Sequence, residues 1–88
     1  MTHYTLSPHV VLQSLEDKLV VLNIEQNAYY ALNGSARWFL ENLLEGLDVH
    51  EVVQKAPEHF VDTSPDRLSH DVEALVAELL HLGILTAI

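Results

Sequence analysis

Residues 27–34, NAYYALNG, decide the fold, because a strand pattern ends here and a helical pattern begins. The five residues 28–32 hold two tyrosines, two alanines and a leucine, with no charge, proline or glycine among them. Aromatic residues favour strands, and the Asn33-Gly34 pair is typical of a turn. We therefore predict a short strand over 28–32, followed by a turn and then a helix.

Two further strands precede this stretch. Residues 10–15 (VVLQSL) and 18–24 (KLVVLNI) are rich in β-branched residues, and polar turns separate them from each other and from the strand at 28–32. Asn27 belongs to the second of these turns and tolerates positive φ. Two consecutive hairpins predict a three-stranded antiparallel meander. The middle strand should be buried on both faces, and residues 1–7 should form a loose lead-in.

Three helices follow the meander. From residue 35 to 45 the apolar residues recur at helical spacing, and Gly46 ends that segment. A capping box at residues 48–51 opens a second helix, which ends or bends at Pro57. A third begins at Ser64-Pro65 and runs to residue 82, while residues 84–88 form an apolar tail packed on the core. The prediction is an α+β fold of order βββααα, winged helix-turn-helix-like, with residues 1–88 as one domain.

The strand over 28–32 lacks every feature that usually protects a sheet edge. Monomeric proteins place lysine, proline or bulges on exposed edges to prevent further pairing, and none is present here. An unprotected edge can accept a peptide from another molecule as an additional strand. Helix residues Val76 and Leu80, beside Ser69 and Glu73, offer an apolar flank as the opposite wall. The alternative is an ordinary strand with its tyrosines in the core and its edge covered by the tail.

The composition excludes several function classes. The net charge of −9, from 13 acidic and 4 basic residues, disfavours nucleic-acid binding. No apolar run reaches the length of a membrane span, no signal peptide is recognisable, and the chain has no cysteine, so we expect a cytoplasmic protein. Ser69, His70 and Asp71 are consecutive on a helix and diverge, and the six histidines lack metal-ligand spacing. We predict no enzyme activity, no metal site and no cofactor.

The segments LNIEQNAYYALNGSARWFLENLLEG (22–46) and VEALVAELLHLGIL (72–85) resemble the PqqD family, within the wider set of RiPP recognition elements. The resemblance is strongest to the discrete leader-binding proteins of lasso-peptide biosynthesis. It implies a winged helix-turn-helix in which the leader of a ribosomal precursor peptide adds beside the third strand, against the third helix. It also implies a cysteine-protease leader peptidase as partner. The family usually has glycine in the turn where this chain has Asn27-Ala28. The implied contacts are Asn27, Ala28, Tyr29, Tyr30, Ala31, Leu32, Ser69, Val72, Glu73, Val76, Leu79 and Leu80.

Two other functions remain open at this point. Winged-helix proteins include DNA-binding proteins, although Lys55 of the second helix would be flanked by Asp48, Glu51 and Glu58. A structural module that dimerises by pairing two open strand edges would also fit. A leader receptor should instead be a monomer until peptide arrives. The sequence does not indicate whether Tyr29 or Tyr30 faces inward, nor which precursor is bound.

Overall fold

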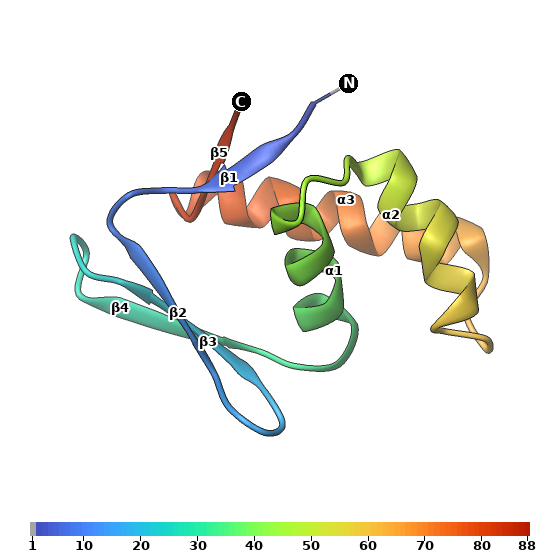
Figure 1. Cartoon of the computed structure of the whole chain (residues 1–88), viewed down its shortest axis with the longest axis horizontal. Helices are drawn as coiled ribbons and strands as arrows, with labels where there is room; N and C mark the ends of the chain where they lie inside the picture. Colours follow the sequence, from blue (N-terminus) through green and yellow to red (C-terminus); the bar gives the residue numbers. More distant parts are fainter. Residues whose placement is uncertain (1) are drawn as a thin grey trace.

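The computed structural model describes residues 2–88, and its largest sheet is the predicted meander (Figure 1). Strands β2 (Val10–Ser14), β3 (Leu19–Asn23) and β4 (Ala28–Leu32) pair antiparallel in the order β2-β3-β4. Asn27 adopts φ 53°, as predicted for the β3–β4 turn. The prediction that β3 is buried on both faces is wrong: one face is buried and the other half-buried, because none of the helices among residues 2–88 packs on the outer side (Figure 1).

Three α-helices follow the sheet, as predicted. They are α1 (Gly34–Leu44), α2 (Val49–Lys55) and α3 (Pro65–His81), with a 3₁₀ turn η1 (Ala56–Glu58) after α2. The capping box of α2 is formed in both directions, from the Glu51 N–H to Asp48 Oδ1 at 2.9 Å and from the Asp48 N–H to Glu51 Oε1 at 3.1 Å. Gly83, at φ 74°, ends α3 in a Schellman motif.

Two short strands extend the predicted βββααα order. β1 (Tyr4–Leu6) pairs antiparallel with β5 (Leu85–Ala87) as a separate two-stranded sheet. The prediction of a loose lead-in over residues 1–7 is therefore wrong for residues 4–6. Ser7 strengthens the pairing, because its Oγ lies 2.8 Å from Thr86 Oγ1. The first and last strands, β1 and β5, consequently lie side by side (Figure 1).

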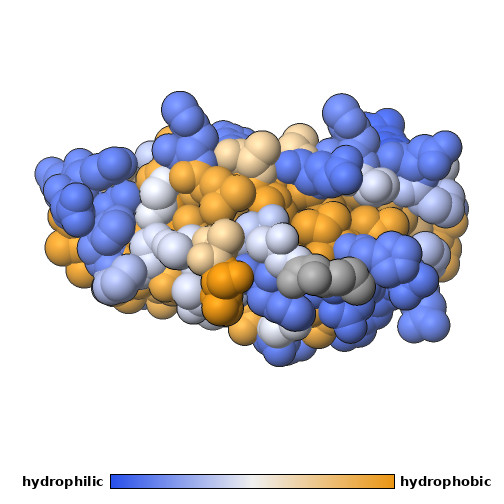
Figure 2. Space-filling view, turned by 90° about the horizontal axis from the view of Figure 1, so that it is seen from above, coloured by the Kyte–Doolittle hydropathy of each residue, from blue (hydrophilic) through white to orange (hydrophobic). Residues whose placement is uncertain are grey.

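The core has two parts. One joins the meander to α3 and the C-terminal strand and contains Val21, Leu40, Leu79 and Ile84. The other joins the three helices; its buried members are Phe39, Leu43, Val52, Ala56, Leu68, Val72 and Val76. Viewed from the side of the chain ends, apolar side chains also gather along the middle of the surface, between polar regions (Figure 2). Within residues 2–88, none of the helices combines the length and apolar character needed to cross a bilayer.

Candidate functional site

Strand β4 is an edge strand. It pairs with β3 on one side, and no other strand among residues 2–88 pairs with its second side. The C-terminal tail, which the alternative interpretation placed over this edge, instead forms β5 and pairs with β1. The unprotected edge predicted from the sequence is therefore present.

The direction of the backbone groups on β3 can be worked out from two hydrogen bonds to β2 and its turn. The Ile24 N–H donates to the His9 carbonyl at 3.0 Å, and the Leu15 N–H donates to the Lys18 carbonyl at 2.8 Å. In an antiparallel pair, residues that exchange hydrogen bonds alternate with residues that do not, so consecutive residues of a central strand face opposite neighbours. The even-numbered residues of β3 thus face β2, and the odd-numbered residues face β4.

The groups at the open edge follow from this alternation. Val21 faces β4, where its partner in the register is Tyr30, so Tyr30 directs its N–H and C=O to β3. Its neighbours Tyr29 and Ala31 direct theirs outward. Two N–H and two C=O groups are therefore free to pair with an incoming strand.

The side chains of β4 alternate in the same way. Tyr30 and Leu32 pack against the core of the meander, whereas Tyr29 is 73% exposed. This settles the orientation that the sequence left open, with Tyr30 inward and Tyr29 outward. The inner side of the edge is apolar beside Tyr30, and its outer side presents Tyr29 and Ala31 to solvent.

The helix residues expected to form the opposite wall are placed differently from the prediction. Val72 is fully buried, Val76 is 5% exposed and Leu79 is 2% exposed, so none of them offers a free surface. The apolar face of α3 is wide because it packs on α1 and α2 as well as on the sheet. Ser69 is half-buried, and Glu73 and Leu80 are exposed on the same flank as Val76.

The other flank of α3 borders a hollow that the sequence prediction missed. This hollow has a volume of about 230 Å³ and lies between the start of α1 and the middle of α3. Because Ser35 follows the end of β4 by three residues, the hollow begins where the open edge ends. Asp71 and Glu78 lie about two turns apart on this flank. Each is about 160° around the helix from the exposed residue two positions later, Glu73 and Leu80 respectively. Its lining residues are Ser35, Ala36, Phe39, Asp71, Ala74, Leu75 and Glu78.

A larger hollow of about 490 Å³ continues from the first toward the start of α3. The two share Ser35 and Asp71, and we call them together the α1–α3 groove. The second hollow is lined by Ser35, Phe60, Asp62, Thr63, Ser64, Arg67, Leu68 and Asp71. The spacing of Asp71, Leu75 and Glu78 along α3 is the signal that could have identified this flank, since it places three residues on one side of the helix.

A third hollow of about 190 Å³ lies at the opposite end of β4, at the β3–β4 turn. It is lined by Leu22, Asn23, Ile24, Asn27, Ala28 and Tyr29. Asn23 is 1% exposed, and its Oδ1 accepts from the Gln26 N–H at 3.1 Å, which helps to hold the turn. The open edge is thus bounded by a hollow at each end.

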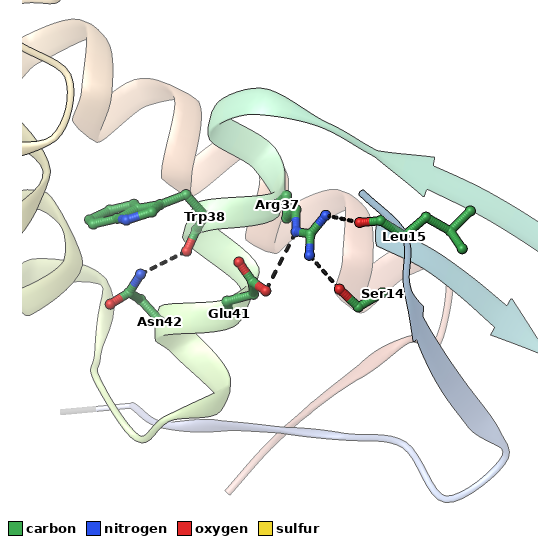
Figure 3. Close-up of polar contacts among 6 residues, drawn as sticks. All are labelled: Ser14, Leu15, Arg37, Trp38, Glu41 and Asn42. Atoms are coloured by element: carbon green, nitrogen blue, oxygen red, sulfur yellow. Dashed lines mark hydrogen bonds and ion pairs between the residues drawn. The ribbon is translucent and has the colours of Figure 1, made fainter. Parts of the chain in front are cut away.

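Arg37 fixes the position of the meander relative to α1 (Figure 3). Its Nη1 donates to the Leu15 carbonyl at 2.7 Å, its Nη2 donates to Ser14 Oγ, and its Nε lies 3.5 Å from Glu41 Oε2. The contact joins the β2–β3 turn to the first turns of α1, the helix that lines the groove. Arg37 therefore helps to set the angle between the strand edge and the α1–α3 groove.

Trp38 lies on the far side of α1 from the meander. Its ring stacks on His59 with 5.1 Å between centroids and meets Phe60 edge to face at 5.3 Å. The Asn42 Nδ2 donates to the Trp38 carbonyl at 2.8 Å, and Lys55 Nζ donates to Asn42 Oδ1 at 2.9 Å. The half-buried Trp38 thus covers one side of the helical part of the core.

One group of potential metal ligands is present among residues 2–88. Ligand atoms of His3, Asp48 and Glu51 lie within 4.8 Å of one another. Both carboxylates already accept backbone hydrogen bonds in the capping box of α2. We assign that structural role to them. Ser69, His70 and Asp71 occupy consecutive positions of α3, about 100° apart around the helix axis, so their side chains diverge.

Comparison with known proteins gives one family match and two structural matches. The model of the family described as coenzyme PQQ synthesis protein D (PqqD) matches residues 18–85. No curated protein sequence matches the chain.

The fold is similar to two solved structures. One is a lasso peptide synthetase B1 complexed with the leader peptide, with 23% identity and a TM-score of 0.88 over 96% of this chain and 98% of that chain. The other is TbiB1 in complex with the TbiA(beta) leader peptide, with 20% identity and a TM-score of 0.84 over 92% and 93%.

Proposed function

The chain belongs to the PqqD family, and from this we propose that it is a non-catalytic module that captures the leader of a ribosomal precursor peptide. The leader adds as a strand along the open edge of β4. The whole chain acts as one domain, on a winged helix-turn-helix-like scaffold. The captured leader is presented to a leader peptidase of the cysteine-protease type and to other maturation enzymes.

The observation that carries this proposal is the unpaired edge at Tyr29 and Ala31. Both backbone N–H groups and both carbonyls point away from β3, and only backbone pairing with a further strand uses all four at once. Both structurally similar proteins were solved with a leader peptide, which supports the same class of ligand here.

The contact set that we propose keeps the strand part of the sequence prediction and replaces the helix part. On β4 and its turn it comprises residues 27–32. On the helices it comprises the residues that line the inner hollow of the α1–α3 groove, in place of the buried Val72, Val76 and Leu79. Side chains of an added strand alternate between two faces, so those on the Tyr30 side point toward the helices.

Hydrogen exchange tests this proposal directly. The probe is a synthetic leader peptide, chosen from candidate precursor leaders by titration for tight binding. On saturation, the amides of Tyr29 and Ala31 should become protected, while those of Tyr30 and Leu32 are protected with or without peptide. A tightly bound leader that leaves the exchange of Tyr29 and Ala31 unchanged would contradict strand addition at this edge.

A further inference from the structure

The α1–α3 groove combines an apolar floor with an acidic rim. Ala36, Phe39, Ala74 and Leu75 line its inner part, where β4 ends. Its charged lining residues are three carboxylates, from Asp62, Asp71 and Glu78, and one guanidinium, from Arg67.

The single cation does not neutralise the rim. Arg67 Nε lies 3.9 Å from Asp71 Oδ2, so this guanidinium is associated with one of the three carboxylates. Asp62 and Glu78 have no ion pair within residues 2–88. The groove therefore favours a ligand with positive charge, in keeping with the net charge of −9 for the whole chain.

Lysine and arginine match both properties of the groove. Their methylene stems cover apolar surface while their charged heads remain at the polar rim. A stem lying on Ala74 and Leu75 would bring its head to Asp71 or Glu78, which flank these two residues along α3. An acidic side chain at the same place would be repelled by the carboxylates of Asp71 and Glu78, and the guanidinium of Arg67 is already associated with Asp71.

The groove is continuous with the proposed strand site. It begins at Ser35, three residues beyond the end of β4, so a peptide that pairs with β4 enters it on leaving the Leu32 end. All pairings in the meander are antiparallel, and an added strand that continues the pattern runs from the Leu32 end to the Ala28 end. The part of the peptide in the groove is then the part that precedes the paired residues.

Building on the proposed function, we propose that the α1–α3 groove selects a leader that carries a lysine or arginine just before its strand-forming residues. The basic side chain inserts between α1 and α3 and pairs with Asp71 or Glu78. The groove thus supplies side-chain specificity, and the open edge of β4 supplies sequence-independent affinity.

A peptide-display experiment tests the inference without knowledge of the natural precursor. A bacterial-display library of random peptides about 15 residues long covers the strand and the groove at about 3.3 Å per residue. Three proteins are used for selection: the wild type, Asp71→Asn with Glu78→Gln, and a matched control, Glu16→Gln with Glu45→Gln. The control removes the same two charges from exposed residues that line none of the hollows described above.

We expect wild type and control to enrich peptides with lysine or arginine at one fixed place before an apolar strand pattern. The groove variant should lose this enrichment, and it should bind the selected peptides about tenfold more weakly, a loss typical of charged hydrogen bonds. Circular dichroism confirms that all three proteins are folded.

Two results would overturn the inference, and they have different meanings. In the first, the selected peptides show no preference for lysine or arginine, or the groove variant selects the same basic peptides as the wild type. Either outcome refutes the groove as the selector but leaves strand capture intact. If no peptide is enriched by the wild type over an Ala31→Pro variant, strand capture itself fails and the inference fails with it.

Discussion

The substitution Ala31→Pro should weaken peptide binding while leaving the protein folded. The Ala31 N–H points to the open edge, so its loss breaks no hydrogen bond to β3. Proline is tolerated on edge strands where the missing donor faces solvent, and the free energy of unfolding should fall by about 1 kcal/mol or less. Proline at Tyr30, one residue earlier, removes an N–H that donates to β3. This substitution should lower the free energy of unfolding by about 2–3 kcal/mol.

The effect on binding follows from the four outward backbone groups. Ala31→Pro deletes one of the two N–H donors and leaves a peptide carbonyl without a partner at a partly desolvated edge. Loss of one partner costs about 1–3 kcal/mol, and the ring also obstructs close approach of the strand. A total of about 2–3 kcal/mol corresponds to a dissociation constant raised about 30- to 150-fold.

Isothermal titration calorimetry with the cognate leader measures this effect, and thermal unfolding measures the stability of each variant. Ala31→Val keeps the donor and should bind far more tightly than the proline variant. The reasoning is refuted if Ala31→Pro binds like the wild type. If instead Ala31→Pro unfolds and Tyr30→Pro remains stable, the alternation deduced for β4 is off by one residue.

The other predictions concern stability, geometry and assembly. Phe39→Ala should lower the free energy of unfolding by about 3–5 kcal/mol, because Phe39 is 1% exposed, while the exposed control Val61→Ala should change it little in chemical denaturation. Asp48→Ala removes the capping box of α2 and should cost about 1–2 kcal/mol; an unchanged unfolding midpoint would mean that the cap contributes nothing. Arg37→Met should cost about 1–2 kcal/mol and speed amide exchange in the β2–β3 turn, and unaltered exchange there would refute its role in holding the meander on α1. In sedimentation, the protein should be a monomer with and without leader, and a dimer that dissociates when leader is added would point to self-pairing of β4 edges.

The C-terminal tail illustrates what local patterns do not contain. The sequence predicts an apolar tail over residues 84–88 but not its partner, because β1 lies about 80 positions earlier in the chain. Tyr4–Leu6 is only three residues long and shows too little alternation to identify a strand. Pairing between strands so far apart in sequence depends on where α3 places the C-terminal residues. A short stretch of sequence does not contain that information.

Helix α3 shows a similar limit. Its period and its start at Ser64 and end at Gly83 are local properties, and the predicted helix agrees with the observed one within a residue. The sequence also predicts an apolar stripe that is wide for a helix covering only a small sheet. It does not say which neighbour covers each side of that stripe. The structure assigns Val72 and Val76 to the packing with α1 and α2, which leaves the opposite flank, at Asp71 and Glu78, beside the groove.

The sequence by itself determined the meander, the three helices, the N-caps of α2 and α3, and the absence of charge or proline on the strand over 28–32. These features depend on residues close together in the chain, where backbone propensity and side-chain period act directly. Only the tertiary structure decided that the edge of β4 stays open, that Tyr29 and Ala31 direct their backbone groups outward, and that the groove lies on the Asp71 flank of α3. Each of these depends on which distant segment occupies a given side, and packing between segments far apart in sequence decides that.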